Sequence, residues 1–399
     1  MKLPWLAVAL STVLLSGVAA RARLAGGAAA AVSLVRVPHG GIQPEAVVDA
    51  RGVLHLLYFF GSDARAGDLF YVRSTDEGTT FSAPVRVNSQ EHSAIATGTI
   101  RGGQLAVGAD GRVHVAWNGS DQATPRGLIN PATGQPSAPF LYARSNATGT
   151  AFDAQRNLPR RSYGIDGGGS IAADGRGGVY AAWHALAAGG GQGEDHRLVW
   201  IVRSTDQGAT FTEEHPVWAE ATGACSCCGL RLLTLAPERL VLLYRSATAV
   251  THRDIFILAS NDGGRSFRGS EVQPWDIGAC PMTSMAIAAA GSRVAGAWET
   301  AGQVYFGDVD VSAATVAAPT AAPGAADARK HPRLAIGTRG DTLLVWTEGT
   351  AWARGGALAW RVFDAAGRPT ERSGRASGVP VWSFGAATAR RDGGFTVLY

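Results

Sequence analysis

Lysine is almost absent from this chain of 399 residues, because Lys2 and Lys330 are the only two. Its positive charge comes from arginine instead, and the formal net charge is only +4. No run of basic residues is present of the kind that follows a phosphate backbone, which excludes nucleic acid as a partner. The small positive excess remains compatible with small anionic ligands.

Long apolar runs are equally scarce, since the only one lies at residues 1–20. It combines Lys2, an apolar stretch and the small residues Val18, Ala19 and Ala20, a pattern typical of a secretory signal peptide. An uncleaved membrane anchor is the alternative. No cysteine lies near the expected cleavage site, which excludes a lipid anchor there. We therefore expect a periplasmic or secreted monomer with no membrane span after cleavage.

Charged residues are few, at 17%, whereas hydrophobic residues make up 46% and glycines number 52. Disordered chains show more charge and less hydrophobicity, so this composition predicts a folded protein rich in turns. We expect a signal peptide at 1–20, a linker at 21–30 and one folded domain at 31–399.

An internal repeat dominates that domain. Residues 46–58, 105–117 and 171–183 each alternate apolar and other residues, turn at a cluster of Asp, Gly and Arg, and end in an aromatic residue. This pattern predicts a β-hairpin. Weaker copies follow to the C-terminus, spaced by about 50 to 65 residues, close to the period of four-stranded propeller blades.

A second motif, S-x-D-x-G-x-x-F, joins two further strands of three repeats. Its aspartate can accept hydrogen bonds from backbone N–H groups of its own turn, and its glycine can adopt a positive φ without strain. The three good copies carry the pairs Asp76 and Gly78, Asp206 and Gly208, and Asp262 and Gly264. A degraded fourth copy has Ala147 where the aspartate belongs, so we expect a weaker turn there.

This motif resembles the Asp-box, or BNR repeat, of sialidases and related β-propellers. The resemblance covers nearly everything from about residue 40 onward and implies an all-β propeller of four-stranded antiparallel blades. Our count favours seven blades, with six, the sialidase number, as the alternative. Residues 31–37 resemble an outer strand, and we expect them to complete the last sheet and close the ring. Fold does not fix function, and many Asp-box proteins are not sialidases.

The loops that enter the innermost strands and leave the second strands should gather on one face of the ring, where propellers usually bind ligands. We expect a ligand site there, built from the charged and imidazole side chains that these loops carry: Arg101, Asp166, His184, Arg231, Arg245, Glu299 and Arg333.

All four cysteines also fall in two of these loops, as Cys225, Cys227 and Cys228 in one and Cys280 in the next. An exported protein favours disulfides: one of the three could bridge to Cys280, while Cys225 pairs with Cys228 or stays free. The alternative is a soft-metal site for Cu(I) or Zn on these thiolates, with help from Met282, His184 or His252.

Three functions follow as hypotheses. The first is an exported sialidase-like propeller that binds a glycan or another anionic small molecule at its Cys- and Arg-bearing face, with catalysis not established. The second is an exo-α-sialidase or related glycoside hydrolase, which would need three arginines on a carboxylate together with a tyrosine, a glutamate and an aspartate. Tyr163, Glu299 and Glu348 would have to supply part of that set. The third is a periplasmic protein that handles copper or thiols.

Overall fold

The computed structural model describes Met1, residues 31–326 and residues 328–399. The predicted signal peptide beyond Met1, and the predicted linker, lie outside the described residues. Within the described part, helix is limited to three single 3₁₀ turns, η1 (Pro38–Gly40), η2 (Ala109–Gly111) and η3 (Glu194–His196). None of the helices described there could span a bilayer.

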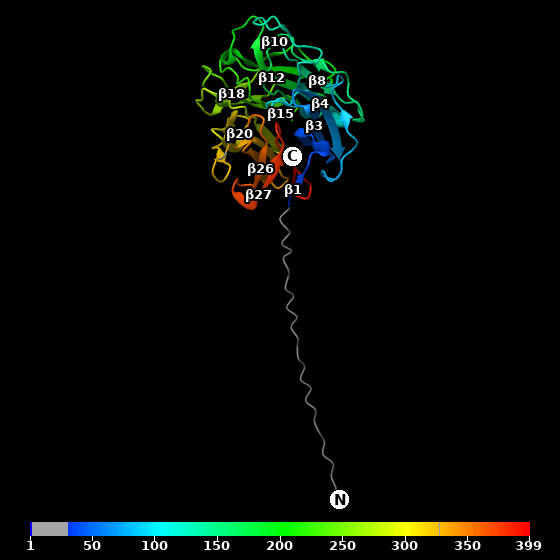
Figure 1. Cartoon of the computed structure of the whole chain (residues 1–399). Helices are drawn as coiled ribbons and strands as arrows, with labels where there is room; N and C mark the ends of the chain where they lie inside the picture. The colour runs from blue at the N-terminus through cyan, green and yellow to red at the C-terminus, as the bar shows by residue number, and fades with distance from the viewer. Residues whose placement is uncertain (2–30, 327) are drawn as a thin grey trace.

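Seven sheets surround a central axis, and the colours of Figure 1 follow one another round the ring from blue to red. Blades one and two contain β2 (Ile42–Val48), β3 (Leu54–Asp63), β4 (Ala66–Ser74) and β5 (Val85–Arg86), then β6 (Gln104–Val107), β7 (Val113–Asn118), β8 (Phe140–Arg144) and β9 (Arg156–Asn157). Blade three contains β11 (Ser170–Ala173), β12 (Val179–Ala187), β13 (Leu198–Ser204) and β14 (His215–Pro216), and the short strand β10 (Ser162–Tyr163) also pairs with β12. Blade four contains β15 (Arg231–Ala236), β16 (Arg239–Arg245), β17 (Ile255–Ser260) and β18 (Arg268–Gln273).

Blades five and six continue the pattern. Blade five contains β19 (Ala286–Ala290), β20 (Arg293–Thr300) and β21 (Gln303–Asp310), and the short strands β22 (Thr315–Val316) and β23 (Thr320–Ala321) both pair with β21. Blade six contains β24 (Lys330–Ile336), β25 (Thr342–Glu348), β26 (Gly356–Phe363) and β27 (Pro369–Val379). The innermost strands pack against one another in the cyclic order β2, β6, β11, β15, β19, β24, β28 and back to β2. The predicted seven-bladed propeller is thereby confirmed.

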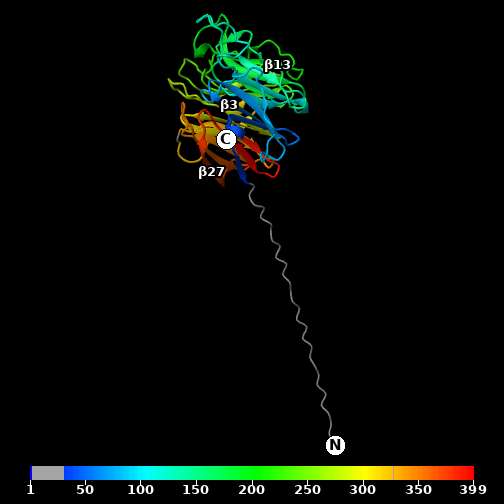
Figure 2. The same ribbon diagram turned by 45° about the vertical axis from the view of Figure 1, so that its right-hand side comes forward.

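The seventh blade closes the ring with both ends of the described chain. It consists of β28 (Ala386–Ala389), β29 (Phe395–Leu398) and β1 (Val32–Val35). Figures 1 and 2 both show the C-terminus beside β1. The N-terminal strand closes the ring as predicted, but this blade differs from a four-stranded antiparallel sheet. It has three strands, and β1 runs parallel to β29.

Tryptophans at the ends of the second strands fill the space between blades. Trp117, Trp183 and Trp298 are fully buried. Such large aromatic side chains contribute strongly to packing between sheets, which explains why the hairpin repeats end in an aromatic residue. Trp346 is almost as deeply buried in blade six.

The three Asp-box turns have nearly identical hydrogen bonds. In the second, Ser204 Oγ donates to Asp206 Oδ1 at 2.7 Å and accepts from the Gly208 N–H at 2.8 Å. Asp206 Oδ1 also accepts from the Thr210 N–H at 2.9 Å, and Gly208 has a φ of +72°. The predicted roles of the aspartate and the glycine in this motif are therefore present in the structure.

The degraded copy keeps its turn because the residue one position before Ala147 supplies the hydrogen-bond acceptor. Asn146 Oδ1 accepts from the Thr150 N–H at 2.9 Å, the same contact across four residues that Asp206 makes with Thr210. The weakness expected from Ala147 is thus offset by its neighbour. Asn146 is uncharged, so its hydrogen bonds lack the charge assistance of an aspartate.

We predict that Asp262→Ala lowers the free energy of unfolding by about 1 kcal/mol at neutral pH, as loss of a comparable capping group does. Burial would raise the pKa of Asp262, but hydrogen bonds from Ser266, Ser260 and the backbone outweigh it and lower the pKa to about 2. This contribution is present above the unfolded pKa of 3.8 and is lost as the pH falls towards 2. Urea unfolding at pH 7, 4 and 2.5 measures the difference, which should shrink in acid. Asp121→Ala, in an exposed loop, is the control, and an equal effect of both substitutions would contradict the prediction.

Candidate functional site

The seven innermost strands enclose a cavity of about 240 Å³ along the ring axis. Its wall is mostly aliphatic and includes Val47, Ala172, Leu232 and Ala286. Three charged side chains lie at the end where the chain enters these strands, which we call the inlet face: Glu45, Arg231 and Arg333. The cavity therefore has one charged end and an aliphatic body.

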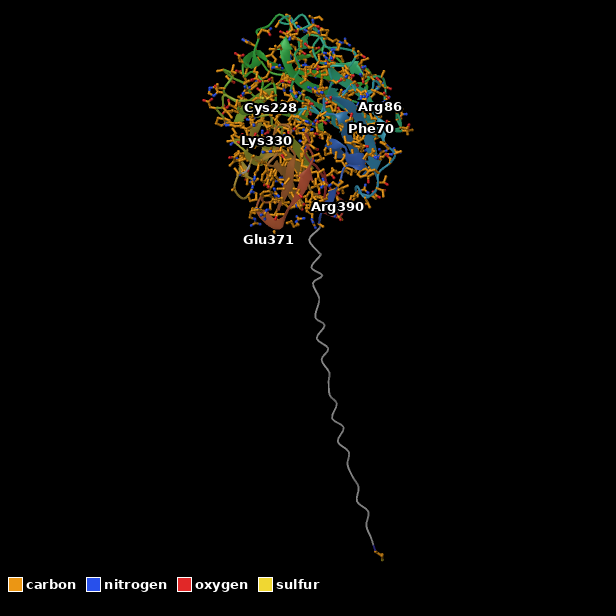
Figure 3. All side chains as sticks on the ribbon, in the orientation of Figure 1. Phe70, Arg86, Cys228, Lys330, Glu371 and Arg390 are labelled. Carbon is orange, nitrogen blue, oxygen red and sulfur yellow. A yellow bond between two sulfur atoms is a disulfide. The ribbon has the colours of Figure 1, made fainter. Side chains whose placement is uncertain are left out.

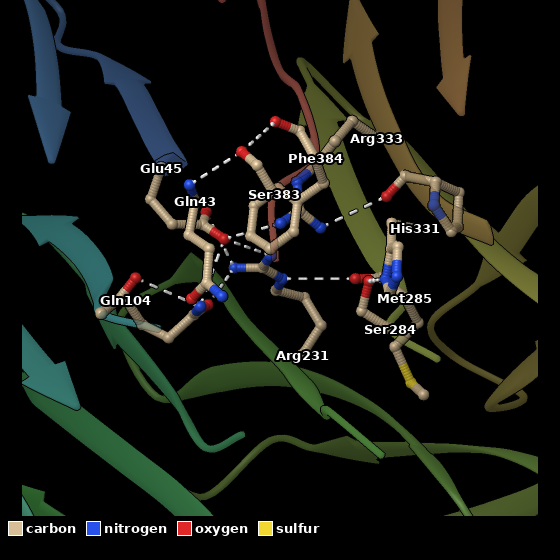
Figure 4. Close-up of polar contacts among 12 residues, drawn as sticks. Gln43, Glu45, Gln104, Arg231, Ser284, Met285, His331, Arg333, Ser383 and Phe384 are labelled. Carbon is tan, nitrogen blue, oxygen red and sulfur yellow. Dashed lines mark hydrogen bonds and ion pairs between the residues drawn. The ribbon is translucent and has the colours of Figure 1, made fainter. Parts of the chain in front are cut away.

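The charged end is a single hydrogen-bonded cluster, shown in Figure 4. Glu45 Oε1 accepts from Nη2 of Arg231 and from Nη2 of Arg333, each at 2.9 Å. Glu45 Oε2 accepts from Arg231 Nη1 at 3.2 Å. Gln104 donates its amide to Glu45 Oε1 at 3.2 Å and accepts from Arg231. We call these four residues the channel cluster.

Four blades supply the channel cluster from the same position of their innermost strands. Each member pairs with the fourth or fifth residue of its blade's second strand: Glu45 with Leu57, Gln104 with Ala116, Arg231 with Leu243 and Arg333 with Val345. Equivalent positions in a propeller meet at the axis, so residues as far apart as 45 and 333 become neighbours.

The channel cluster carries one excess positive charge, because two guanidiniums share one carboxylate. Burial would raise the pKa of Glu45, but the charges of Arg231 and Arg333 and hydrogen bonds from Arg231 and Gln104 lower it overall. Burial lowers the pKa of Arg333 to about 10, although Glu45 opposes this shift. Glu45 and Arg333 therefore stay ionised near neutral pH.

The inlet side of the channel cluster is closed by buried polar residues. Gln43 donates its amide to the carbonyl oxygens of Ala96 at 2.6 Å and of Trp382 at 2.7 Å. His331 Nδ1 lies 3.2 Å from Ser284 Oγ, and burial lowers the pKa of this imidazole well below its ordinary value, so it is neutral.

Of the seven predicted ligand residues, the structure places Arg231 and Arg333 in the channel cluster. Arg101 instead pairs with Asp166 at the inlet face, and its Nε donates to the Asp166 carbonyl at 2.7 Å. The other three, which are His184, Arg245 and Glu299, are buried in the second strands β12, β16 and β20 and bond mainly to backbone groups.

Sequence reasoning missed Glu45 and Gln104 as members of the site. A signal for Glu45 was present, because it directly precedes the hairpin repeat of its blade, as Arg231 and Arg333 precede theirs. A comparison of that one position between blades would have selected it. The convergence of unlike charges on the axis was not visible in any single repeat.

The groups considered for sialidase chemistry are separated. The Tyr163 hydroxyl accepts from Gln192 at 2.7 Å, and Glu299 Oε1 accepts from the Gly302 N–H at 2.7 Å. Glu348 lies within 3.5 Å of Arg329 and 3.0 Å of Arg375. In the part of the chain that the structure describes, no tyrosine lines the channel cavity.

The two cysteine-bearing loops lie side by side, as predicted for adjacent blades. Cys227 and Cys280 form a disulfide, which confirms the predicted bridge to Cys280. Cys225 and Cys228 are buried thiols whose Sγ atoms lie 2.6 Å apart. Figure 3 labels Cys228 and Lys330 inside the outline of the ring and Glu371 at its edge.

Comparison with known proteins identifies the fold. No family model matches the chain, and no curated relative matches it. Among solved structures, a protein of unknown function from Dyadobacter fermentans superposes with a TM-score of 0.52 at 13% identity, covering 88% of this chain and 97% of that one. The Hadza microbial sialidase Hz136 gives 0.50 at 15% identity, covering 77% and 63%.

Trypanosoma rangeli sialidase, in complex with the inhibitor DANA, also gives a TM-score of 0.50 at 11% identity, covering 79% of this chain and 54% of that chain. The chain thus spans less than two thirds of the length of these two sialidases. At such low identity the likeness establishes architecture alone. Together with the three Asp boxes, it shows that this chain has the fold of the sialidase-like Asp-box β-propellers.

Proposed function

We propose that this chain is an exported propeller that binds a small carboxylate-bearing molecule, with an acidic monosaccharide as one class, in its central channel. The observation that carries the proposal is the excess positive charge of the channel cluster on the wall of a cavity. The proposal narrows the expected glycan or anionic ligand to one chemical group. It also moves the site from the loops of the inlet face to the channel.

Arg333 has donors to spare for such a ligand. Its Nη2 is engaged by Glu45, but Nη1 contacts only the Pro332 carbonyl at 3.3 Å and Nε has no hydrogen-bond partner. A buried guanidinium donor without a partner is unfavourable, and a carboxylate would satisfy it through charge-assisted hydrogen bonds. The ligand carboxylate would lie beside Glu45 and balance the remaining charge.

The size and lining of the cavity limit the rest of the ligand. Its volume, about 240 Å³, is below the roughly 300–1,000 Å³ of pockets for drug-sized molecules. The aliphatic wall beyond the channel cluster offers few side-chain hydrogen bonds. These features favour a compact monocarboxylate over an extended oligosaccharide.

We predict that purified mature protein binds glucuronate or lactate in calorimetric titration and binds glucose much more weakly. Arg333→Met should weaken carboxylate binding by about 10- to 100-fold, since hydrogen bonds to charged groups contribute about 1.5–3 kcal/mol. Arg101→Met is the matched control, because Arg101 pairs with Asp166 at the inlet face. Unchanged affinity in Arg333→Met, or loss of binding in Arg101→Met, would place the site elsewhere.

We also predict that Glu45→Gln lowers the free energy of unfolding by about 3 kcal/mol at pH 7, because it leaves the buried guanidinium of Arg333 and the part-buried one of Arg231 without a counter-charge. The pKa of Glu45 is lowered in the folded state, so its contribution is present above pH 4.5 and is lost in acid. The gap to the wild type should therefore narrow in acid. Thermal unfolding in glucuronate should show partial rescue of Glu45→Gln.

The double variant Glu45→Gln/Arg333→Met removes one charge of each sign and should be more stable than Glu45→Gln alone. Glu213→Gln, at an exposed ion pair with Arg161, serves as the control for loss of a carboxylate. If Glu45→Gln were no less stable than Glu213→Gln, the charge balance argued for the channel cluster would be wrong.

For catalysis, we predict no hydrolysis of a fluorogenic α-sialoside above the buffer rate. The two channel guanidiniums share a carboxylate, and Tyr163, Glu299 and Glu348 are engaged elsewhere. A retaining sialidase needs its nucleophile and clamp on the same sugar. Turnover that is abolished by Arg231→Ala would instead establish the exo-α-sialidase alternative.

A further inference from the structure

The cysteine loops hold three sulfur atoms in a buried group beside a fourth, exposed cysteine. Sγ of Cys225 lies 2.6 Å from Sγ of Cys228 and 3.6 Å from Sγ of Cys227, and all three lie within 4.8 Å of one another. Cys227 is engaged in the disulfide to Cys280. Two thiols of a C-x-x-C segment therefore remain as donors.

A thioether-bearing side chain lies beside this group of donors. Met282 packs against Cys225, Cys227 and Cys228 and is only partly buried. The same methionine lines a small cleft at the inlet face together with Lys330, Trp352 and Trp382. Met282 thus lies between the buried thiols and a surface opening, which offers a path to them.

Buried guanidiniums favour negative charge at this position. Arg245 is 2% exposed and donates to the carbonyl oxygens of Arg253 and Glu299, but it forms no ion pair in the described part of the chain. Its Nε has no partner, and neither has Nη1 of Arg253 or of Arg197. Arg253 pairs with Glu194, and the Glu299 carboxylate is also nearby and opposes thiolate formation at Cys228. A buried cation without a counter-charge is unfavourable unless a negative group compensates it.

We propose that Cys225 and Cys228 bind one Cu(I) ion as thiolates, with Met282 as a third sulfur ligand. Thiolate and thioether donors favour soft metals such as Cu(I) and zinc, and a set of three sulfur ligands fits Cu(I) better because structural zinc needs four nitrogen or sulfur ligands. Binding releases the two thiol protons and changes no oxidation state. The resulting bis-thiolate centre carries a charge of −1, which the guanidinium of Arg245 offsets. The Cys227–Cys280 disulfide holds the two loops together and is not a ligand.

The test is an anaerobic titration of the mature protein with Cu(I), in competition with bathocuproine disulfonate. We expect one Cu(I) per chain in the wild type and in the double variant Cys227→Ser/Cys280→Ser, which lacks the disulfide. Binding should be lost in Cys225→Ser and in Cys228→Ser. In Met282→Leu the X-ray absorption spectrum should show one sulfur fewer around copper than in the wild type.

Several results would overturn the proposal. One is a folded Cys225→Ser or Cys228→Ser variant, judged by circular dichroism, that keeps the wild-type affinity. A second is a wild type, with both thiols confirmed free by alkylation and mass spectrometry, that fails to compete with the chelator. X-ray absorption of the wild type decides the matter even if the serine variants do not fold, because a nitrogen or oxygen shell around copper would exclude the sulfur site.

Discussion

The closure of the ring is the constraint on which this structure depends. Each blade buries one face against the next, so the seventh blade must also pack against the first. The pairing of β1 with β29 meets this requirement, because it adds residues from the start of the domain to its last sheet. It also covers one edge of a two-stranded hairpin, which would be marginally stable on its own.

Closure explains why the channel cluster exists. When seven similar strands surround one axis, residues at the same position of each strand must lie near one another. Glu45, Gln104, Arg231 and Arg333 occupy that position in four blades, and the three charged members meet at the wall of the channel cavity. The Glu45 carboxylate offsets the charge of one of the two guanidiniums, which lowers the cost of placing these charges together. The positive charge that remains makes the cluster a candidate for binding an anion.

The same geometry separates two chemistries in one molecule. Hard, charged oxygen and nitrogen groups gather on the axis. Soft sulfur groups gather between the loops of blades four and five, where Cys227 and Cys280 join the two loops. Both regions carry buried arginines that lack a full set of partners, Arg333 in the first and Arg245 in the second. In each case an anionic group would satisfy donors that the protein leaves unsatisfied.

The sequence alone determined the repeated parts of this protein. The Asp-box turns depend on contacts within about eight residues, so their residues could be read directly, and the alternation of apolar residues predicted the hairpins, the seven blades and the N-terminal closure. It did not predict that Asn146 rescues the degraded turn, because the substitute lies one position out of register. It identified the cysteine loops as neighbours but left the pairing open, with Cys227 among three choices.

Only the tertiary structure decided which charged loop residues form a site. Arg231 and Arg333 were candidates alongside Arg101 and Arg245, and the sequence could not rank them. Arg101 lies in the loop before its innermost strand and Arg245 ends the second strand β16, so neither occupies the axial position of Arg231 and Arg333. On an inner strand, a shift of one residue likewise turns a side chain from the channel toward a neighbouring blade. Whether a charge meets Glu45, a backbone carbonyl or solvent therefore depends on contacts between residues that are far apart in the chain, and no local pattern records them.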